Sequence, residues 1–374
     1  MASKLFTVAV ESYSRAVILK SLLEKDGISC ILSNVNIIQP DASSGVKIKV
    51  NEEDLEKAIE IAKRLKSDKP TEAVFAKKKG STRIIVPVDF SDYSRNASFY
   101  ALHIAGKYQE SEIQLLYVYY TPDMATIPYS ETYFFSEPVS KQIQEIKEQS
   151  EEKMDRLIKE LTEESDKCGF NHVKVNYSLV QGTPSDSILY FSESYMPDLI
   201  VVGARGAGSR KDFMGSSSIK VVLKAQFPVL VVPENSVFDE KKKEYNIVYA
   251  TNYDEADFIA ITKLMKLMDA FKIRIYCTHI GSPTDERWEE MKMEGLKKYF
   301  SGNYPKVKIH CSTIEEEDII SGLEKMVSEK NIDIISLITH RRNLLTQIIN
   351  PSVAKKVFYH TNLPLFVFHT SINP

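Results

Sequence analysis

An apolar run leads directly into a glycine-rich loop in residues 198–218, which read DLIVVGARGAGSRKDFMGSSS. The apolar run has the length and the β-branched content of a buried strand. The glycines follow it, and Ser216, Ser217 and Ser218 then open a predicted helix over residues 216–225. An earlier stretch, RIIVPVDFS at residues 83–91, predicts a second buried strand that ends at Asp89 and precedes another helix. Buried strands that alternate with helices indicate a parallel sheet covered on both faces.

The same alternation extends over residues 82–235, which we interpret as one domain. Strands are expected at 83–89, 113–119, 173–179, 198–202 and 228–232, and helices at about 92–108, 139–168, 184–193 and 216–225. The pattern predicts a doubly wound, five-stranded parallel sheet.

Residues 244–374 repeat this scheme. DIISLI at residues 333–338 matches DLIVVG at 198–203, and LPLFVF at 363–368 matches FPVLVV at 227–232. The repeat of about 140 residues is longer than the repeats of solenoids, so it predicts two tandem domains with a sheet each. Charged stretches at residues 67–82 and 235–244 have no apolar face and are expected to be linkers.

Residues 1–70 show a different order, β-α-β-β-α, which fits a ferredoxin-like α+β domain. Strands are expected at 5–10, 28–32 and 46–50, and helices over 12–25 and from residue 51 onward. This order resembles a small family of signal-transducing domains. A regulatory role and a plain packing role both remain open for it.

Composition narrows the class of protein. Of 374 residues, 43% are hydrophobic and 26% charged, and the net charge is −3. These values are typical of a globular protein and give no electrostatic reason to expect nucleic acid or an anionic membrane as a partner. The four cysteines are far apart, the first residues lack the apolar core of a signal peptide, and no apolar run of membrane-spanning length occurs. We therefore expect a cytoplasmic protein with reduced thiols.

The chemistry is expected where the two distinctive strands end. Ligands of open parallel sheets bind beyond the carboxyl ends of the strands, at the point where strand order reverses. Glycines let backbone N–H groups approach an anion, and a helix N-terminus adds an oriented dipole. The loop of residues 203–218 is thus predicted to hold phosphates, and Asp89 to accept hydrogen bonds from a ribose. A tight glycine turn and a helix-capping role of Asp89 are the open alternatives, and Arg205 and Lys211 either face the phosphates or belong to a solvated loop.

These motifs resemble those of ATP-binding universal stress proteins, which carry an aspartate after the first strand and a late glycine motif. This sequence has Gly203, two residues, Gly206, then eight residues before Gly215-Ser216, where the family has nine. Gly182-Thr183-Pro184 is similar to the turn before the family's third helix. The resemblance implies an adenine against Val88 and Val118, with Pro87 also among the binding residues, the ribose at Asp89, and phosphates along the loop at Gly203, Arg205, Gly206, Gly215, Ser216, Ser217 and Ser218. It implies ATP, ADP or AMP as the ligand, with Mg²⁺ accompanying the nucleotide.

The second copy departs from this pattern. Asn252 stands in place of Asp89, Ile338 and Arg341 in place of Gly203 and Gly206, and Asn350-Pro351 in place of Gly215-Ser216. Proline removes an N–H donor, so this copy is predicted not to bind nucleotide in the same manner. The resemblance implies pairing through the last strands, residues 229–232 and 365–368, which would make an intramolecular pseudo-dimer; a further homodimer is also open.

Binding is expected rather than catalysis, because no nucleophile–base set or metal-ligand motif stands out. The expected role is stress response or signalling through an unidentified protein partner, and aromatic residues in the connection 121–137 suggest a lid or a partner surface. Weak ATP hydrolysis, self-phosphorylation at residues 216–218 and a scaffold without nucleotide are the alternatives.

Overall fold

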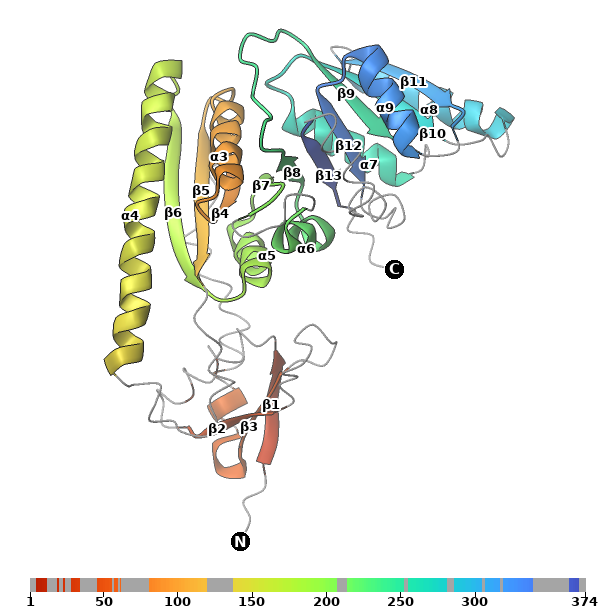
Figure 1. Cartoon of the computed structure of the whole chain (residues 1–374). Coiled ribbons are helices and arrows are strands. Elements are labelled where there is room, and N and C mark those ends of the chain that lie inside the picture. The colour runs from red at the N-terminus through yellow and green to blue at the C-terminus, as the bar shows by residue number, and fades with distance from the viewer. Residues whose placement is uncertain are drawn as a thin grey trace. The chain divides into compact units, whose positions relative to one another are not determined.

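A computed structural model describes residues 5–11, 19, 23, 28–33, 46–55, 57–59, 61, 81–119, 137–206, 214–251, 255–280, 286–304, 307–316, 319–338 and 363–369. The described residues belong to two compact units (Figure 1). The small unit lies within residues 1–77 and 122–139, and the large unit within residues 78–121 and 140–374.

The small unit contains a three-stranded antiparallel sheet with the strand order β1-β3-β2. Its strands are β1 (Leu5–Glu11), β2 (Cys30–Ser33) and β3 (Val46–Asn51), and a 3₁₀ turn, η1 (Glu52–Asp54), follows. Leu19, Leu23 and Ile48 are among the side chains of its core. The three expected strands are therefore present. Most of the helix expected over 12–25 lies outside the described residues, and the ferredoxin-like fold stays a prediction.

The large unit is built on a ten-stranded sheet with the order β11-β10-β9-β12-β13-β8-β7-β4-β5-β6 (Figure 1). The first half comprises β4 (Thr82–Val88), α3 (Asp92–Ala105), β5 (Ser111–Tyr119), α4 (Glu137–Cys168), β6 (Val173–Gln181), α5 (Pro184–Tyr195), β7 (Leu199–Gly203), α6 (Ser216–Lys224) and β8 (Val229–Val232). The second comprises β9 (Tyr245–Ala250), α7 (Glu255–Leu267), β10 (Ile273–Ile280), α8 (Glu286–Asn303), β11 (Lys308–Ile314), α9 (Ile319–Lys330), β12 (Ile334–Ile338) and β13 (Leu365–Phe368).

The two halves have the same strand order, third-second-first-fourth-fifth, and every strand pair within a half is parallel. They join where β13 pairs antiparallel with β8, with Phe366 opposite Leu230. The two predicted five-stranded sheets thus form one continuous sheet, and the expected contact between the last strands is present. Each of these strands would otherwise leave its outer backbone groups unpaired at a sheet edge, and their pairing satisfies both edges at once.

A repeated backbone clamp fixes the first strand against the fourth in both halves. Arg83 N donates to Asp198 Oδ2 at 2.9 Å, while Asp198 N donates to Arg83 O at 2.8 Å. Asn246 and Asp333 make the same two hydrogen bonds, each at 2.8 Å. Residue 83 therefore corresponds to residue 246, and residue 198 to residue 333.

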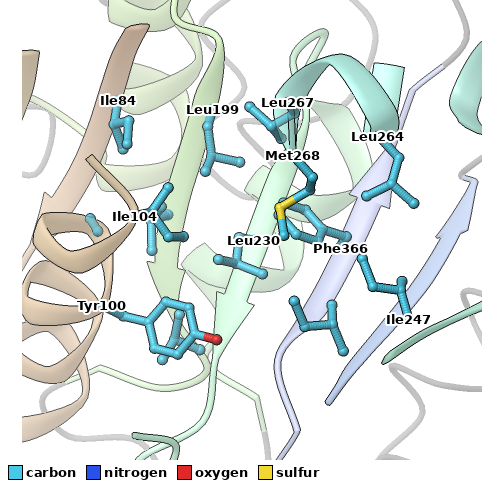
Figure 2. Packing of buried hydrophobic residues seen from close by; sticks show 14 of the residues in the cluster. Ile84, Tyr100, Ile104, Leu199, Leu230, Ile247, Leu264, Leu267, Met268 and Phe366 are labelled. Atoms are coloured by element: carbon cyan, nitrogen blue, oxygen red, sulfur yellow. The ribbon is translucent and has the colours of Figure 1, made fainter. Parts of the chain in front are cut away.

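One hydrophobic cluster runs through both halves (Figure 2). It includes Ile84 and Leu230 from the first half and Leu264, Met268 and Phe366 from the second. Side chains on both sides of the β8–β13 pair thus share a core, so burial of apolar surface stabilises the halves together. None of the helices within the described residues combines the length and apolar content needed to cross a membrane.

Candidate functional site

The site lies at the carboxyl ends of β4 and β7, where the strand order of the first half reverses. The ladder between these strands joins Ile84 to Leu199 and Ile85 to Ile200. Beyond those pairs β4 continues to Val88, while β7 follows β8 as far as Gly203. The carboxyl ends are therefore where a ligand can approach the backbone of both strands.

Asp89 follows β4 directly and is held by the start of α3. Its Oδ1 accepts hydrogen bonds from Ser91 N at 3.1 Å and from Ser91 Oγ at 2.5 Å, and its own N–H donates to Ser94 Oγ at 3.2 Å. Ser91, not Asp89, is the N-cap residue of α3. Phe90 between them has φ 62°, a left-handed conformation that costs a bulky residue energy and recurs at binding sites. These contacts fix one carboxylate oxygen of Asp89 in place.

Gly206 lies against the other carboxylate oxygen of Asp89. A Cβ at position 206 would collide with Asp89 Oδ2. The structure therefore brings together two residues that the sequence analysis assigned to one site from opposite strand ends. Only glycine leaves the carboxylate where it is.

Gly203 has a different reason to be glycine. A Cβ there would lie 2.8 Å from the backbone carbonyl carbon of Tyr93, in the first turn of α3. The absence of a side chain thus allows α3 to pack on the end of β7. The prediction that Gly203 contacts phosphate is untested, since this packing alone requires a glycine.

Arg205 turns toward α3 rather than outward. The residue is buried, its Nη1 donates to Tyr93 Oη at 2.8 Å, and its guanidinium carbon lies 5.4 Å from the centre of the Tyr93 ring. Burial, followed by a hydrogen bond with Glu234, raises the pKa of Tyr93, and Arg205 opposes that rise. Phosphate contact by Arg205 stays a prediction that requires the side chain to leave Tyr93; Lys211 lies outside the described residues.

The N-terminus of α6 lies where the sequence predicted donors for a phosphate. Its N-cap residue, Gly215, makes no side-chain cap, so the N–H groups of the first turn have no acceptor within the helix. Ser216 is exposed and Ser217 half-buried. Ser218 Oγ instead donates to Gly203 O at 2.9 Å, which ties the helix to the end of β7. Ser218 therefore has a structural role here, and anion contact by Ser216 and Ser217 stays a prediction.

The residues expected to contact adenine lie on two faces of the sheet. Val88 is in register with Tyr117 and Pro87 with Leu116. Side chains alternate along a strand, so Val118 shares its face with Pro87, while Val88 points to the other face and joins the core. One ring cannot lie against the side chains of both valines. Pro87 and Val118 remain compatible with a single planar ligand.

The second half carries a buried polar network that the sequence analysis missed. Asp257 is fully buried and accepts hydrogen bonds from Tyr249 Oη and Thr251 Oγ1, both at 2.8 Å. Counted from the matched clamps, Asp257 corresponds to Ser94 in the first half. Ile338, in the position of Gly203, is buried in the core. Asn252, Arg341, Asn350 and Pro351 lie outside the described residues, as does the predicted lid at 121–136.

The first half is similar in sequence to known universal stress proteins. The sequence profile of the "Universal stress protein family" matches residues 80–233. The sequence is 30% identical over 151 residues to "Universal stress protein MJ0531" of Methanocaldococcus jannaschii, covering 40% of this chain and 81% of that protein. It is 30% identical over 156 residues to "Universal stress protein YxiE" of Bacillus subtilis, covering 40% of this chain and 97% of that protein.

A solved structure shares the fold over a longer span. The crystal structure of a universal stress protein from Archaeoglobus fulgidus has a TM-score of 0.51 and 17% sequence identity, and it covers 78% of this chain and 97% of that chain. At this identity the likeness shows the fold alone.

Proposed function

The chain belongs to the universal stress protein family through residues 80–233, and we propose that it binds an adenine nucleotide at Asp89 and the N-terminus of α6. The observation that carries this proposal is the contact between Asp89 and Gly206 at the switch point of the sheet. Nucleotide binding would serve a stress-response or signalling role in the cytoplasm.

The proposed roles follow from the donors and acceptors present. Ribose hydroxyls donate to carboxylates, and Asp89 offers oxygens that are already oriented by Ser91 and Gly206. Phosphate is an acceptor of N–H groups at helix N-termini, which α6 provides with an uncapped first turn and the Ser216 hydroxyl. Pro87 and Val118 would flank the base. These groups fit a nucleotide without a contribution from Arg205.

The loop is one residue shorter than the motif it resembles. We expect this length to determine which of ATP, ADP and AMP binds most tightly. We also expect it to determine whether Mg²⁺ binds with the nucleotide. Ser216 is exposed beside the proposed phosphate position. Because this hydroxyl is exposed, self-phosphorylation of Ser216 is the alternative activity that we propose.

We further propose that the second half is a degenerate copy of the first. The shared strand order and the matched clamps of Asp198 and Asp333 support this. In place of Ser94 it has the buried Asp257 network, so its switch point is stabilised internally rather than kept for a ligand. Its role would be to cover the edge of β8 as a covalently tied pseudo-dimer partner.

The test is nucleotide binding by calorimetry on the full chain, with ATP, ADP and AMP as separate ligands. We expect Asp89→Ala to weaken binding about 10- to 100-fold, the loss of hydrogen bonds to a charged acceptor worth about 1.5–3 kcal/mol. Gly206→Val should have at least this effect, because its side chain displaces the Asp89 carboxylate.

Asn252→Ala is the matched control, since it changes the corresponding position of the second half and should leave affinity unchanged. Equal affinity in the Asp89→Ala and wild-type proteins would refute the assigned site. Absence of binding of all three nucleotides at millimolar concentration would refute the proposed function.

A further inference from the structure

A second cluster of ligand-type side chains lies on the first half, outside the residues of the proposed nucleotide site. It consists of His103 near the end of α3, Glu164 and Cys168 near the end of α4, and Glu240 in the connection between the halves. Glu240 Oε1 lies 2.6 Å from His103 Nδ1 and 3.1 Å from Cys168 Sγ. One ligand atom from each of His103, Cys168 and Glu240 lies within 4.8 Å of the others.

The His103 ring is held in a fixed orientation. It stacks on Phe238 with ring centroids 5.5 Å apart and an angle of 8°, and it meets Phe170 edge-on at 5.9 Å. Its side chain is only 12% exposed. Nδ1 is shielded from solvent and has no partner of hydrogen-bond geometry among the described residues, although the Glu240 carboxylate lies so close. A shielded ring nitrogen thus lies at ion-pair distance from a carboxylate, in a geometry that is not that of a hydrogen bond.

The donor set favours a particular cation. Imidazole nitrogen, thiolate sulfur and carboxylate oxygen together are the ligands that Zn²⁺ takes. A tetrahedral Zn²⁺, with bonds of about 2.0 Å to nitrogen and oxygen and about 2.3 Å to sulfur, separates its ligand atoms by roughly 3.3–3.6 Å. Glu240 Oε1 needs to move away from His103 Nδ1 and from Cys168 Sγ by less than about 1 Å to reach that spacing. Glu240 is exposed and belongs to a connection rather than a helix, so it is the ligand best able to move.

Glu164 occupies the position of an outer partner. Its Oε1 lies 3.8 Å from His103 Nε2, the ring nitrogen opposite the cluster, and 3.8 Å from Cys168 Sγ. Its Oε2 lies 3.4 Å from Lys167 Nζ. Metal-bound histidines characteristically donate their second ring N–H to a carboxylate, which fixes the tautomer.

We propose that His103, Cys168 and Glu240 bind one Zn²⁺, with Glu164 orienting the histidine. Three protein ligands leave a fourth position for water. The ligands come from two helices and the connection 233–244, so the metal would fasten that connection to the first half. This site is independent of the proposed nucleotide site.

The experiment uses the tag-free full chain, stripped with a chelator and freed of nucleotide. Zn²⁺ is titrated in competition with a chromophoric chelator, and Co²⁺ is used separately to detect a thiolate-to-cobalt charge-transfer band. We expect one equivalent of Zn²⁺ and a charge-transfer band that Cys168→Ser abolishes.

Variants of the cluster distinguish the side chains that bind the metal from those that only lie beside it. Loss of an outer partner alone costs about 10- to 100-fold in metal affinity, so Glu164→Gln should fall in that range and Cys168→Ser and Glu240→Gln should lose at least about 100-fold. Cys30→Ser, in the small unit, is the matched control and should bind as wild type. Circular dichroism of each variant establishes that it is folded.

Two results would overturn the proposal. One is a wild-type protein that takes up no Zn²⁺ from the competing chelator. The other is a folded Cys168→Ser variant that keeps wild-type affinity, which would place the metal elsewhere and leave the cluster as a histidine–glutamate ion pair.

Discussion

At the scale of single residues, the glycines of one motif serve different physical needs. Gly203 is needed where α3 crosses β7, because a side chain would meet the Tyr93 backbone. Gly206 is needed where the chain passes Asp89. A motif that is written as one pattern thus combines a packing requirement with a site requirement. Substitutions at Gly203 and Gly206 should distinguish the packing requirement from the site requirement.

We predict that Gly203→Ala lowers the free energy of unfolding by about 1–3 kcal/mol, because the added methyl forces α3 away from β7. Gly295→Ala is the control: its Cβ has nothing within 4 Å and it lies inside α8, so the exchange should raise stability by about 0.5–1 kcal/mol. Urea unfolding of both variants is the measurement. A Gly203→Ala protein as stable as wild type would show that α3 adjusts without cost.

The sequence predicted which residues lie together at the site better than it predicted the directions in which their side chains point. Asp89 and Gly206 meet as expected, because strand ends of a parallel sheet converge. Arg205 turns inward to Tyr93, and Val88 and Val118 point to opposite faces. Neither outcome follows from the residue types alone: the first depends on a tyrosine 112 positions away, the second on strand register.

At the scale of elements, the sequence predicted the strands well but predicted only part of how the strands pair into a sheet. Continuous apolar runs marked β4, β7 and β12, and the predicted bounds differ from those observed by a residue or two. The resemblance also implied that β8 and β13 pair. That the pairing makes one sheet of ten strands follows from the antiparallel register of Leu365 to Val231, which local patterns do not contain.

His369, directly after β13, adds a further contact between the two halves. It is buried, and its Nε2 lies 2.8 Å from Val222 O on α6 of the other half. Burial lowers the pKa of His369 and Lys263 lowers it further, whereas backbone carbonyls of Val222 and Phe227 oppose the change. The folded protein therefore keeps this ring neutral at a pH where the unfolded chain protonates it.

We predict that the stability contributed by neutral His369 is present above the ordinary histidine pKa of about 6.5 and declines as the pH falls below it. In His369→Gln the amide can still donate to Val222 O but does not titrate. The loss of unfolding free energy between pH 7.5 and 5.5 should therefore be smaller in the variant than in wild type. Identical losses in urea titrations would mean that folding leaves the pKa of His369 unchanged and would contradict the prediction.

At the scale of the whole molecule, the two halves of the large unit behave structurally as one body. Their hydrophobic cluster is shared, and Phe238 of the connection packs against Tyr100 of the first half and Phe271 of the second. Tyr108 Oη donates to Leu267 O, and Lys242 pairs with Asp333. Contacts of this kind resemble a domain core rather than a mobile interface, so the peptide link should not be what holds the halves together.

We therefore predict that the halves stay associated after the chain is cut between them. A site for a specific protease inserted after Lys241, which is exposed, allows the cut without removing a buried residue. The fragments 1–241 and 242–374 should co-elute in size exclusion at the position of the intact chain, because the β8–β13 ladder and the shared core survive. The same cut in a Phe366→Asp background is the matched control: a carboxylate in the core opposite Leu230 should let the fragments separate. If the cut protein with Phe366 intact gives two independent, folded monomers, then the second half does not serve to cover β8, and the pseudo-dimer role proposed for it is wrong.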